Sequence, residues 1–124
     1  MSARAALALG AALLFVAVGA GAIGAHAWRA TMAPELQPVF ATAVQYHFFH
    51  ALGLLGVGIL LLHKPGSRLL ALSAWLLVAG ILLFCGTLYV IALTGNHAPG
   101  ALTPVGGLAF LAAWATLAFA AWRW

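Results

Sequence analysis

Four apolar runs, at residues 5–24, 44–62, 69–93 and 105–122, dominate this chain. Each is long enough to cross a bilayer as a helix, which requires roughly 20 mostly apolar residues. All five prolines lie in the segments between the runs. Charged residues make up 5% of the chain, whereas they form about a quarter of a soluble domain. We therefore predict an all-α integral membrane protein with one domain over residues 1–124, folded as a four-transmembrane-helix bundle.

The first run has some features of a cleavable signal peptide: a basic start, an apolar middle and the small-x-small ending Ala25-His26-Ala27. Its apolar stretch of about 20 residues is long for such a signal. We expect this segment to be kept as the first membrane crossing.

The basic residues predict the orientation of the bundle. Alternating crossings place four of the five on one side and one on the other: Arg4, Lys64, Arg68 and Arg123 against Arg29. Basic residues in short loops are retained in the cytoplasm, so both termini and the inner loop 63–68 are predicted to be cytoplasmic, with 25–43 and 94–104 outside. The charges are scattered rather than gathered on one face, which argues against a nucleic-acid partner.

The outer segment 25–43 is predicted to lie along the membrane surface. Its part at 32–44 is too short and too polar to span, and we expect a short amphipathic helix or turn there with Pro34 at a helix start. Glu35, the only acidic residue, is a candidate ion-pair partner for Arg29.

Four of the five histidines fall on the predicted outer side. His47 and His50, three positions apart on one helix, could face one ion, with His26 or His97 as a third ligand. Neutral imidazoles suit zinc, copper or iron. The simpler interpretation, which we favour, is that they are interface residues, with His47 in contact with water and headgroups. His50 lies one turn deeper and requires a partner inside the bundle.

Other polar and small residues are assigned structural roles. We expect interhelical hydrogen bonds from a polar core of Tyr46, Tyr89, Thr87 and Asn96, with Thr87, Tyr89 and Asn96 as candidate partners of His50. Thr103 is predicted to cap the last helix and Pro104 to occupy its first turn, while Gly106 and Gly107 allow close packing. Cys85 is expected to be a buried core residue.

Small residues also repeat every four positions, which lets helices approach closely in lipid. The sequence does not separate packing within one chain from packing between chains. The pairs are Ala6/Gly10, Ala17/Gly21 and Ala20/Gly24 in the first run, and Ala109/Ala113 and Thr116/Ala120 in the fourth.

The residue inventory argues against an enzyme and against an ion-coupled carrier. The chain has no Asp and one Glu, so it cannot build a Ser-His-Asp triad or a pair of catalytic carboxylates. No apolar run carries an acid or base at its centre, as proton-coupled carriers generally require.

Three strings together resemble a known family: GAIGAHAW (21–28), FATAVQYHFFHALGLL (40–55) and FCGTLYVIALTGNHAPGALTPVGGLAFLAAW (84–114). The chain is similar over nearly its whole length to the domain-of-unknown-function 423 family of small membrane proteins. The resemblance implies four transmembrane helices in a bacterial inner membrane, with no established activity. His26 and His50 fall within the family motifs, whereas His47 stands where Gln or another polar residue is expected.

These observations predict a non-enzymatic structural or accessory subunit of a membrane complex, in contact with lipid and with other subunits or copies of itself. No cofactor is expected. The alternative is a metal- or haem-binding protein at the periplasmic face that uses His26 and His50. A third possibility is passive conduction of a small solute through an oligomeric pore.

Overall fold

The computed structural model describes residues 1–124 and is entirely helical. Four helical stretches are long and apolar enough to cross a membrane: Ala3–Trp28, Pro34–His63, Arg68–Thr94 and Ala98–Trp122. They contain the helices α1 (Ala3–Ile23), α2 (Gln37–His63), α3 (Arg68–Gly80), α4 (Gly86–Thr94) and α5 (Thr103–Trp122). Single π-helical turns at Gly24–Trp28 and Ile81–Cys85 extend α1 and join α3 to α4, and 3-10 turns at Pro34–Leu36 and Ala98–Ala101 precede α2 and α5.

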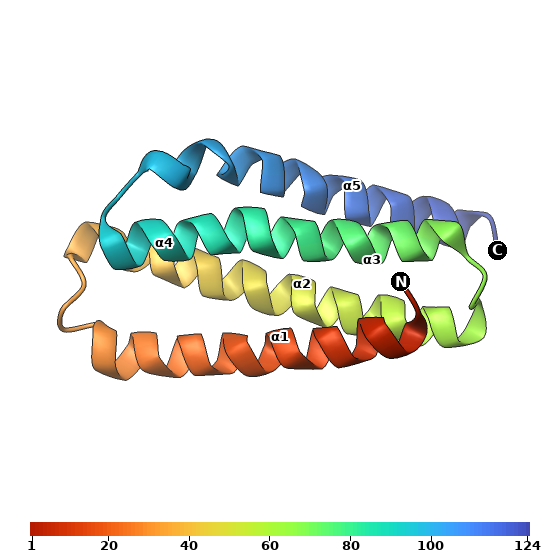
Figure 1. The fold of residues 1–124 in the computed structure, drawn as a ribbon, viewed down its shortest axis with the longest axis horizontal. Coiled ribbons are helices and arrows are strands. Elements are labelled where there is room, and N and C mark those ends of the chain that lie inside the picture. The colour runs from red at the N-terminus through yellow and green to blue at the C-terminus, as the bar shows by residue number, and fades with distance from the viewer.

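The helices run side by side, and both chain termini lie at the same end as the α2–α3 loop (Figure 1). We call this the termini end. The connections α1–α2 and α4–α5 lie at the opposite end, which we call the Arg29 end. α1 packs chiefly against α2, and α5 packs chiefly against α3 and the π-helical turn that follows it. α1 is therefore an outer helix with one main neighbour.

Three of the four spans begin and end close to the predicted positions, but α2 begins at Gln37 rather than at residue 44. The predicted helix start at Pro34 is confirmed, but the segment at 32–44 is not a separate surface element, because from Gln37 it is continuous with the helix of the second span. Its two prolines do not interrupt the helix: Pro34 starts a 3-10 turn and Pro38 lies in the first turn of α2. Proline is tolerated there because the first N–H groups of a helix have no intrahelical partner.

Hydrogen bonds to side chains fix the helix starts at the termini end. The Ala5 backbone N–H donates to the Ser2 hydroxyl (3.2 Å), and the Leu70 N–H donates to the Ser67 hydroxyl (3.3 Å). At the Arg29 end, α4 stops at Gly95, which adopts a left-handed conformation with φ of 70°. Such a residue is a common helix terminator because glycine has no Cβ to clash.

Phenylalanine rings pack directly on helix glycines at both π-helical turns. The Phe40 ring of α2 occupies the space that a Cβ on Gly24 would need, and the Phe110 ring of α5 does the same at Gly80. The backbone of Phe84 lies against Gly106, so α5 and the π-helical turn at Ile81–Cys85 meet backbone to backbone. These contacts bring the helices closer than any larger residue would allow.

Small residues form the interface between α1 and α2. Ala6, Gly10 and Ala17 are the buried residues of α1. A Cβ on Gly10 would lie 3.0 Å from the Leu55 side chain, and a Cβ on Gly58 would lie 2.9 Å from the Leu7 side chain. The small-residue pair Ala6/Gly10 therefore packs against another helix of the same chain.

Candidate functional site

A hydrogen bond between two helices lies inside the bundle. His47 of α2 is 3% exposed, and its Nδ1 lies 2.9 Å from the Tyr89 hydroxyl of α4. Its Nε2 is buried without a hydrogen-bond partner, although a backbone group of Leu13 in α1 lies close to the ring. The prediction that His47 meets water at the interface is wrong, because α2 starts earlier and places His47 about 15 Å along the helix.

His50 is also buried, at 6% exposed. Its Nδ1 lies 2.6 Å from the backbone carbonyl of Tyr46, one turn earlier in α2. Since a carbonyl only accepts, Nδ1 carries the proton. The ring stacks on Phe110 of α5 with centroids 3.4 Å apart. His50 therefore finds its hydrogen-bond partner within its own helix and its packing partner on α5.

Two further polar contacts connect α3 and α4 to α5. The Ser73 hydroxyl of α3 donates to the Ala113 carbonyl (2.9 Å), and the hydroxyls of Thr87 and Thr103 are 2.6 Å apart. Thr103 was predicted to cap α5, but it makes no capping bond because its hydroxyl is turned toward Thr87. Pro104 does lie in the first turn of α5.

Asn96 does not belong to the polar core, contrary to the prediction. It is exposed in the α4–α5 loop, where its Oδ1 accepts a hydrogen bond from the Ala98 N–H (3.0 Å). This short-range contact is typical of asparagine in turns, since its side chain reaches its own backbone two residues on. His50 thus has none of the three partners proposed for it.

The four histidines at the predicted outer side do not come together. No group of three or more His, Cys, Asp or Glu side chains lies close enough to hold a metal ion. His26 and His97 are exposed at the Arg29 end, whereas His50 lies about 20 Å along α2 from the start of that helix. The chain alone therefore does not assemble the metal site that the spacing of His47 and His50 suggested.

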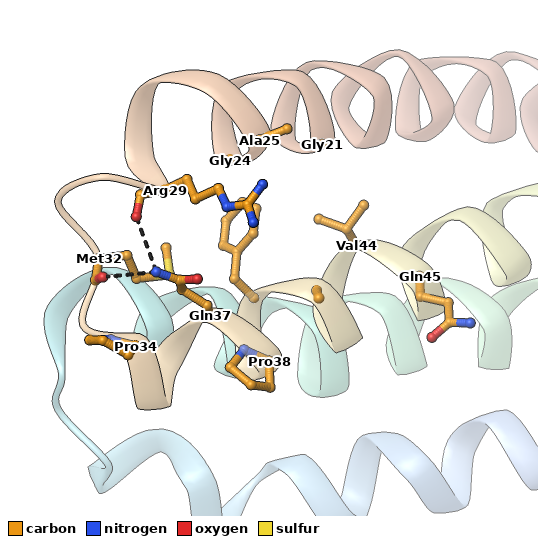
Figure 2. Close-up of a pocket in the computed structure, with 12 residues that line it drawn as sticks. Gly21, Gly24, Ala25, Arg29, Met32, Pro34, Gln37, Pro38, Val44 and Gln45 are labelled. Carbon is orange, nitrogen blue, oxygen red and sulfur yellow. Dashed lines mark hydrogen bonds between the residues drawn. The ribbon is translucent and has the colours of Figure 1, made fainter.

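A cavity of about 570 Å³ lies between α1 and the beginning of α2 at the Arg29 end (Figure 2). Its walls are mostly glycine, alanine, proline and other apolar residues of the two helices, with Gly21 and Val44 among the residues farthest from the loop. Arg29 is the one charged residue of the lining, and Gln37 and Gln45 are the others with polar side chains. The cavity is therefore amphipathic, with its charge at one side.

Gln37 holds the loop that carries Arg29. Its side-chain amide donates to the backbone carbonyls of Arg29 (3.1 Å) and Met32 (3.3 Å), as Figure 2 shows. Arg29 makes no ion pair with Glu35, the only acidic residue, contrary to the pairing considered from the sequence. No sequence pattern points to Gln37, because the segment around it is predicted to be a short amphipathic helix or turn along the membrane surface.

Two aromatic contacts separate this cavity from the His47–Tyr89 pair. Phe40 lines the cavity, and its ring lies 5.7 Å from that of Trp28 and 5.5 Å from that of Tyr89 in edge-on geometry. Phe40 is buried. The outer cavity and the buried hydrogen bond are thus neighbouring features that share one ring as a wall.

Comparison with known families gives one match. The model of the family described as "Protein of unknown function (DUF423)" matches residues 20–107. This range includes the cavity, the His47–Tyr89 pair and the contact between Thr87 and Thr103. No solved structure gives a significant match.

Several curated bacterial membrane proteins are similar to this chain over most of its length. The UPF0382 membrane protein YwdK of Bacillus subtilis is 42% identical over 113 residues, which cover 91% of this chain and 92% of the relative. The UPF0382 inner membrane protein YgdD of Escherichia coli is 36% identical over 109 residues, which cover 88% of this chain and 82% of the relative.

Proposed function

Because this chain belongs to the DUF423 family of membrane proteins, whose description names no activity, we propose its function from its own structure. It is a non-enzymatic structural or accessory subunit of a membrane complex. It resides in the bacterial inner membrane with both termini in the cytoplasm. The name of the E. coli relative as an inner membrane protein supports this location.

The observation that carries this proposal is the uncovered face of α1. α1 packs chiefly against α2, and its opposite side is exposed, with Phe15 81% accessible. The interhelical hydrogen bonds between side chains join α2 to α4 and α4 to α5, and none involves α1. A long apolar helix held on one side leaves a surface on which another membrane helix can pack.

The composition of that face suits a helix partner. Ala8 and Ala12 are exposed on α1 at small-xxx-small spacing, and a Cβ on Gly19 would meet nothing within 4 Å. Since apolar side chains gain nothing from leaving lipid, close contact between small residues is what drives helices together in a bilayer. These positions are distinct from Ala6, Gly10 and Ala17, which already contact α2.

Native mass spectrometry of the untagged protein, extracted from its own membrane in mild detergent, tests the proposal. We expect a complex that contains at least one other membrane subunit. The variant Ala8→Leu/Ala12→Leu should release that subunit, because two leucine side chains prevent close approach along the face. Thermal unfolding should be unchanged, since both positions are exposed.

The matched control is Ala118→Leu/Ala121→Leu, two exposed positions on α5. It should retain the subunit. A wild-type protein that is isolated only as a bare monomer would contradict the accessory role, and one isolated only with copies of itself would replace it with self-assembly.

A further inference from the structure

We propose that the cavity between α1 and α2 binds one membrane phospholipid with an anionic headgroup, whose phosphate contacts Arg29 and whose acyl chain enters between the helices. The inference is independent of the accessory role proposed above. It rests on the position, charge and shape of the cavity.

The charge of the cavity is the first step. Arg29 is the one basic residue at the Arg29 end, whereas the other four lie at the termini end. Charge at the termini end is explained by membrane orientation, but that explanation does not cover Arg29. Its guanidinium has no carboxylate partner in the chain and lines the cavity. Arginine is suited to phosphate because its planar group offers paired donors.

The second step is that the position of Arg29 is built into the fold. Gln37 binds the carbonyls of Arg29 and Met32, which fixes the loop against the start of α2. In Figure 2 the Arg29 side chain extends from this loop into the space between the α1 ribbon and α2. The backbone that carries Arg29 is therefore held beside the cavity by a specific contact, and the Arg29 side chain is one of the residues that line it.

The third step concerns what fills the cavity. Its volume of about 570 Å³ is within the range of small-molecule sites, about 300 to 1,000 Å³. Beyond Arg29 and the two glutamines its walls are apolar, and α1 beside it exposes Ile23 and Ala22 to the surroundings. In a bilayer the surrounding molecules are lipids, and their acyl chains are the apolar groups that can enter the cavity. The polar loop and apolar interior match a phospholipid in its membrane orientation.

Site-resolved photocrosslinking tests the proposal on the full chain in bilayer nanodiscs. The probes are phosphatidylglycerol and phosphatidylcholine with the same diazirine-bearing acyl chain, and crosslinked peptides are mapped by mass spectrometry. Residues 21–45 should crosslink to phosphatidylglycerol about fivefold more than to phosphatidylcholine, because one arginine near the headgroups favours an anionic lipid by roughly that factor. Mapping by peptide separates this site from the four cations at the termini end.

Two variants and one control complete the test. Arg29→Gln should reduce the ratio of phosphatidylglycerol to phosphatidylcholine crosslinking at residues 21–45 to about one. Arg4→Gln, which replaces an exposed arginine at the termini end, should leave this ratio unchanged. Ala41→Leu, which narrows the cavity from α2, should reduce crosslinking by both lipids. Equal crosslinking of the two lipids in the wild type, or an unchanged preference in Arg29→Gln, would overturn the proposal. Circular dichroism establishes that each variant folds.

Discussion

At the scale of single residues, the hydrogen bond between His47 and Tyr89 joins α2 to α4 deep in an apolar interior. Polar residues inside membrane spans are rare and often functional. Here the immediate effect is structural, because the bond pairs two polar groups that would otherwise be buried alone. The remaining Nε2 of His47 is unpaired, so the pair is not fully satisfied. Such an arrangement fixes which faces of α2 and α4 meet.

Removing the Tyr89 hydroxyl should destabilise the protein. Tyr89→Phe leaves both ring nitrogens of His47 without a partner. We expect a loss of about 0.6 to 1.7 kcal/mol in the free energy of unfolding, from the average to the maximum measured for such bonds in a membrane bundle. The double variant His47→Leu/Tyr89→Phe should lose less than the sum of the two single variants, because it removes both polar groups together. Reversible unfolding in mixed micelles measures each value. Additive losses would show that the two side chains are not coupled.

Gly106 and Gly107 provide a matched pair, because only the first meets the backbone of the neighbouring span. A Cβ on Gly106 would clash with the Phe84 backbone, whereas one on Gly107 would make ordinary contacts at 3.8 Å. Gly106→Ala should lower stability by about 1 to 3 kcal/mol through overpacking. Gly107→Ala should be neutral or stabilising by up to about 1 kcal/mol, since alanine favours the helix. Thermal unfolding in one detergent compares them, and equal melting temperatures would refute the close approach.

Residue-scale predictions from the sequence succeed where a local rule decides the outcome. Pro104 lies in the first turn of α5 because proline suits that position. The partners of His47, His50 and Thr103 were not predictable in this way, because they depend on which faces of four helices meet. His50 illustrates the difficulty: its bond to the Tyr46 carbonyl is local, but its burial is set by Phe110, 60 positions along the chain.

At the scale of elements, the start of α2 shows why a proline pattern can mislead. The segment at 32–44 is predicted from the sequence to lie along the membrane surface with Pro34 at a helix start. Pro34 does begin a helical turn, but Pro38 lies in the first turn of α2 and the helix continues through the rest of the segment. The result is a helix that reaches Gln37, so that one element forms the cavity wall, holds the Arg29 loop and carries His47. The early start of α2 therefore determines where Gln37 and His47 lie in the bundle.

The docking of α1 on α2 is also testable at this scale. A Cβ on Gly58 would lie 3.1 Å from the Leu7 backbone nitrogen, whereas one on Gly56, two residues away in the same helix, would meet nothing within 4 Å. Gly58→Ala should lower the melting temperature by pushing α1 away from α2. Gly56→Ala should leave it unchanged or raise it, because alanine is the better helix former. The opposite order would place α1 on a different face of α2.

At the scale of the whole molecule, four apolar runs separated by proline-containing segments were sufficient to predict the fold class. The all-helical membrane fold is confirmed by the four spans and by the membrane proteins to which the chain is similar. The cavity was not predictable from the same runs, because it lies between α1 and α2 beside Phe40 and Arg29 and depends on how the two helices pack. Hydropathy predicts which segments span a membrane, but it carries no information about the space between them.

The arrangement of the ends leads to the last prediction. Both termini and the α2–α3 loop share one end (Figure 1), and this end carries four of the five basic residues. The positive-inside rule predicts that this end is cytoplasmic. Cys85 is the only cysteine and is fully buried, so the natural chain gives a low background for labelling.

Asn96→Cys, at an exposed position of the Arg29 end, should react with a membrane-impermeant maleimide in intact spheroplasts. Ser2→Cys and Gly66→Cys should react only after the membrane is opened. Labelling of the last two in intact spheroplasts, with Asn96→Cys protected, would reverse the orientation and move the Arg29 cavity to the cytoplasmic leaflet.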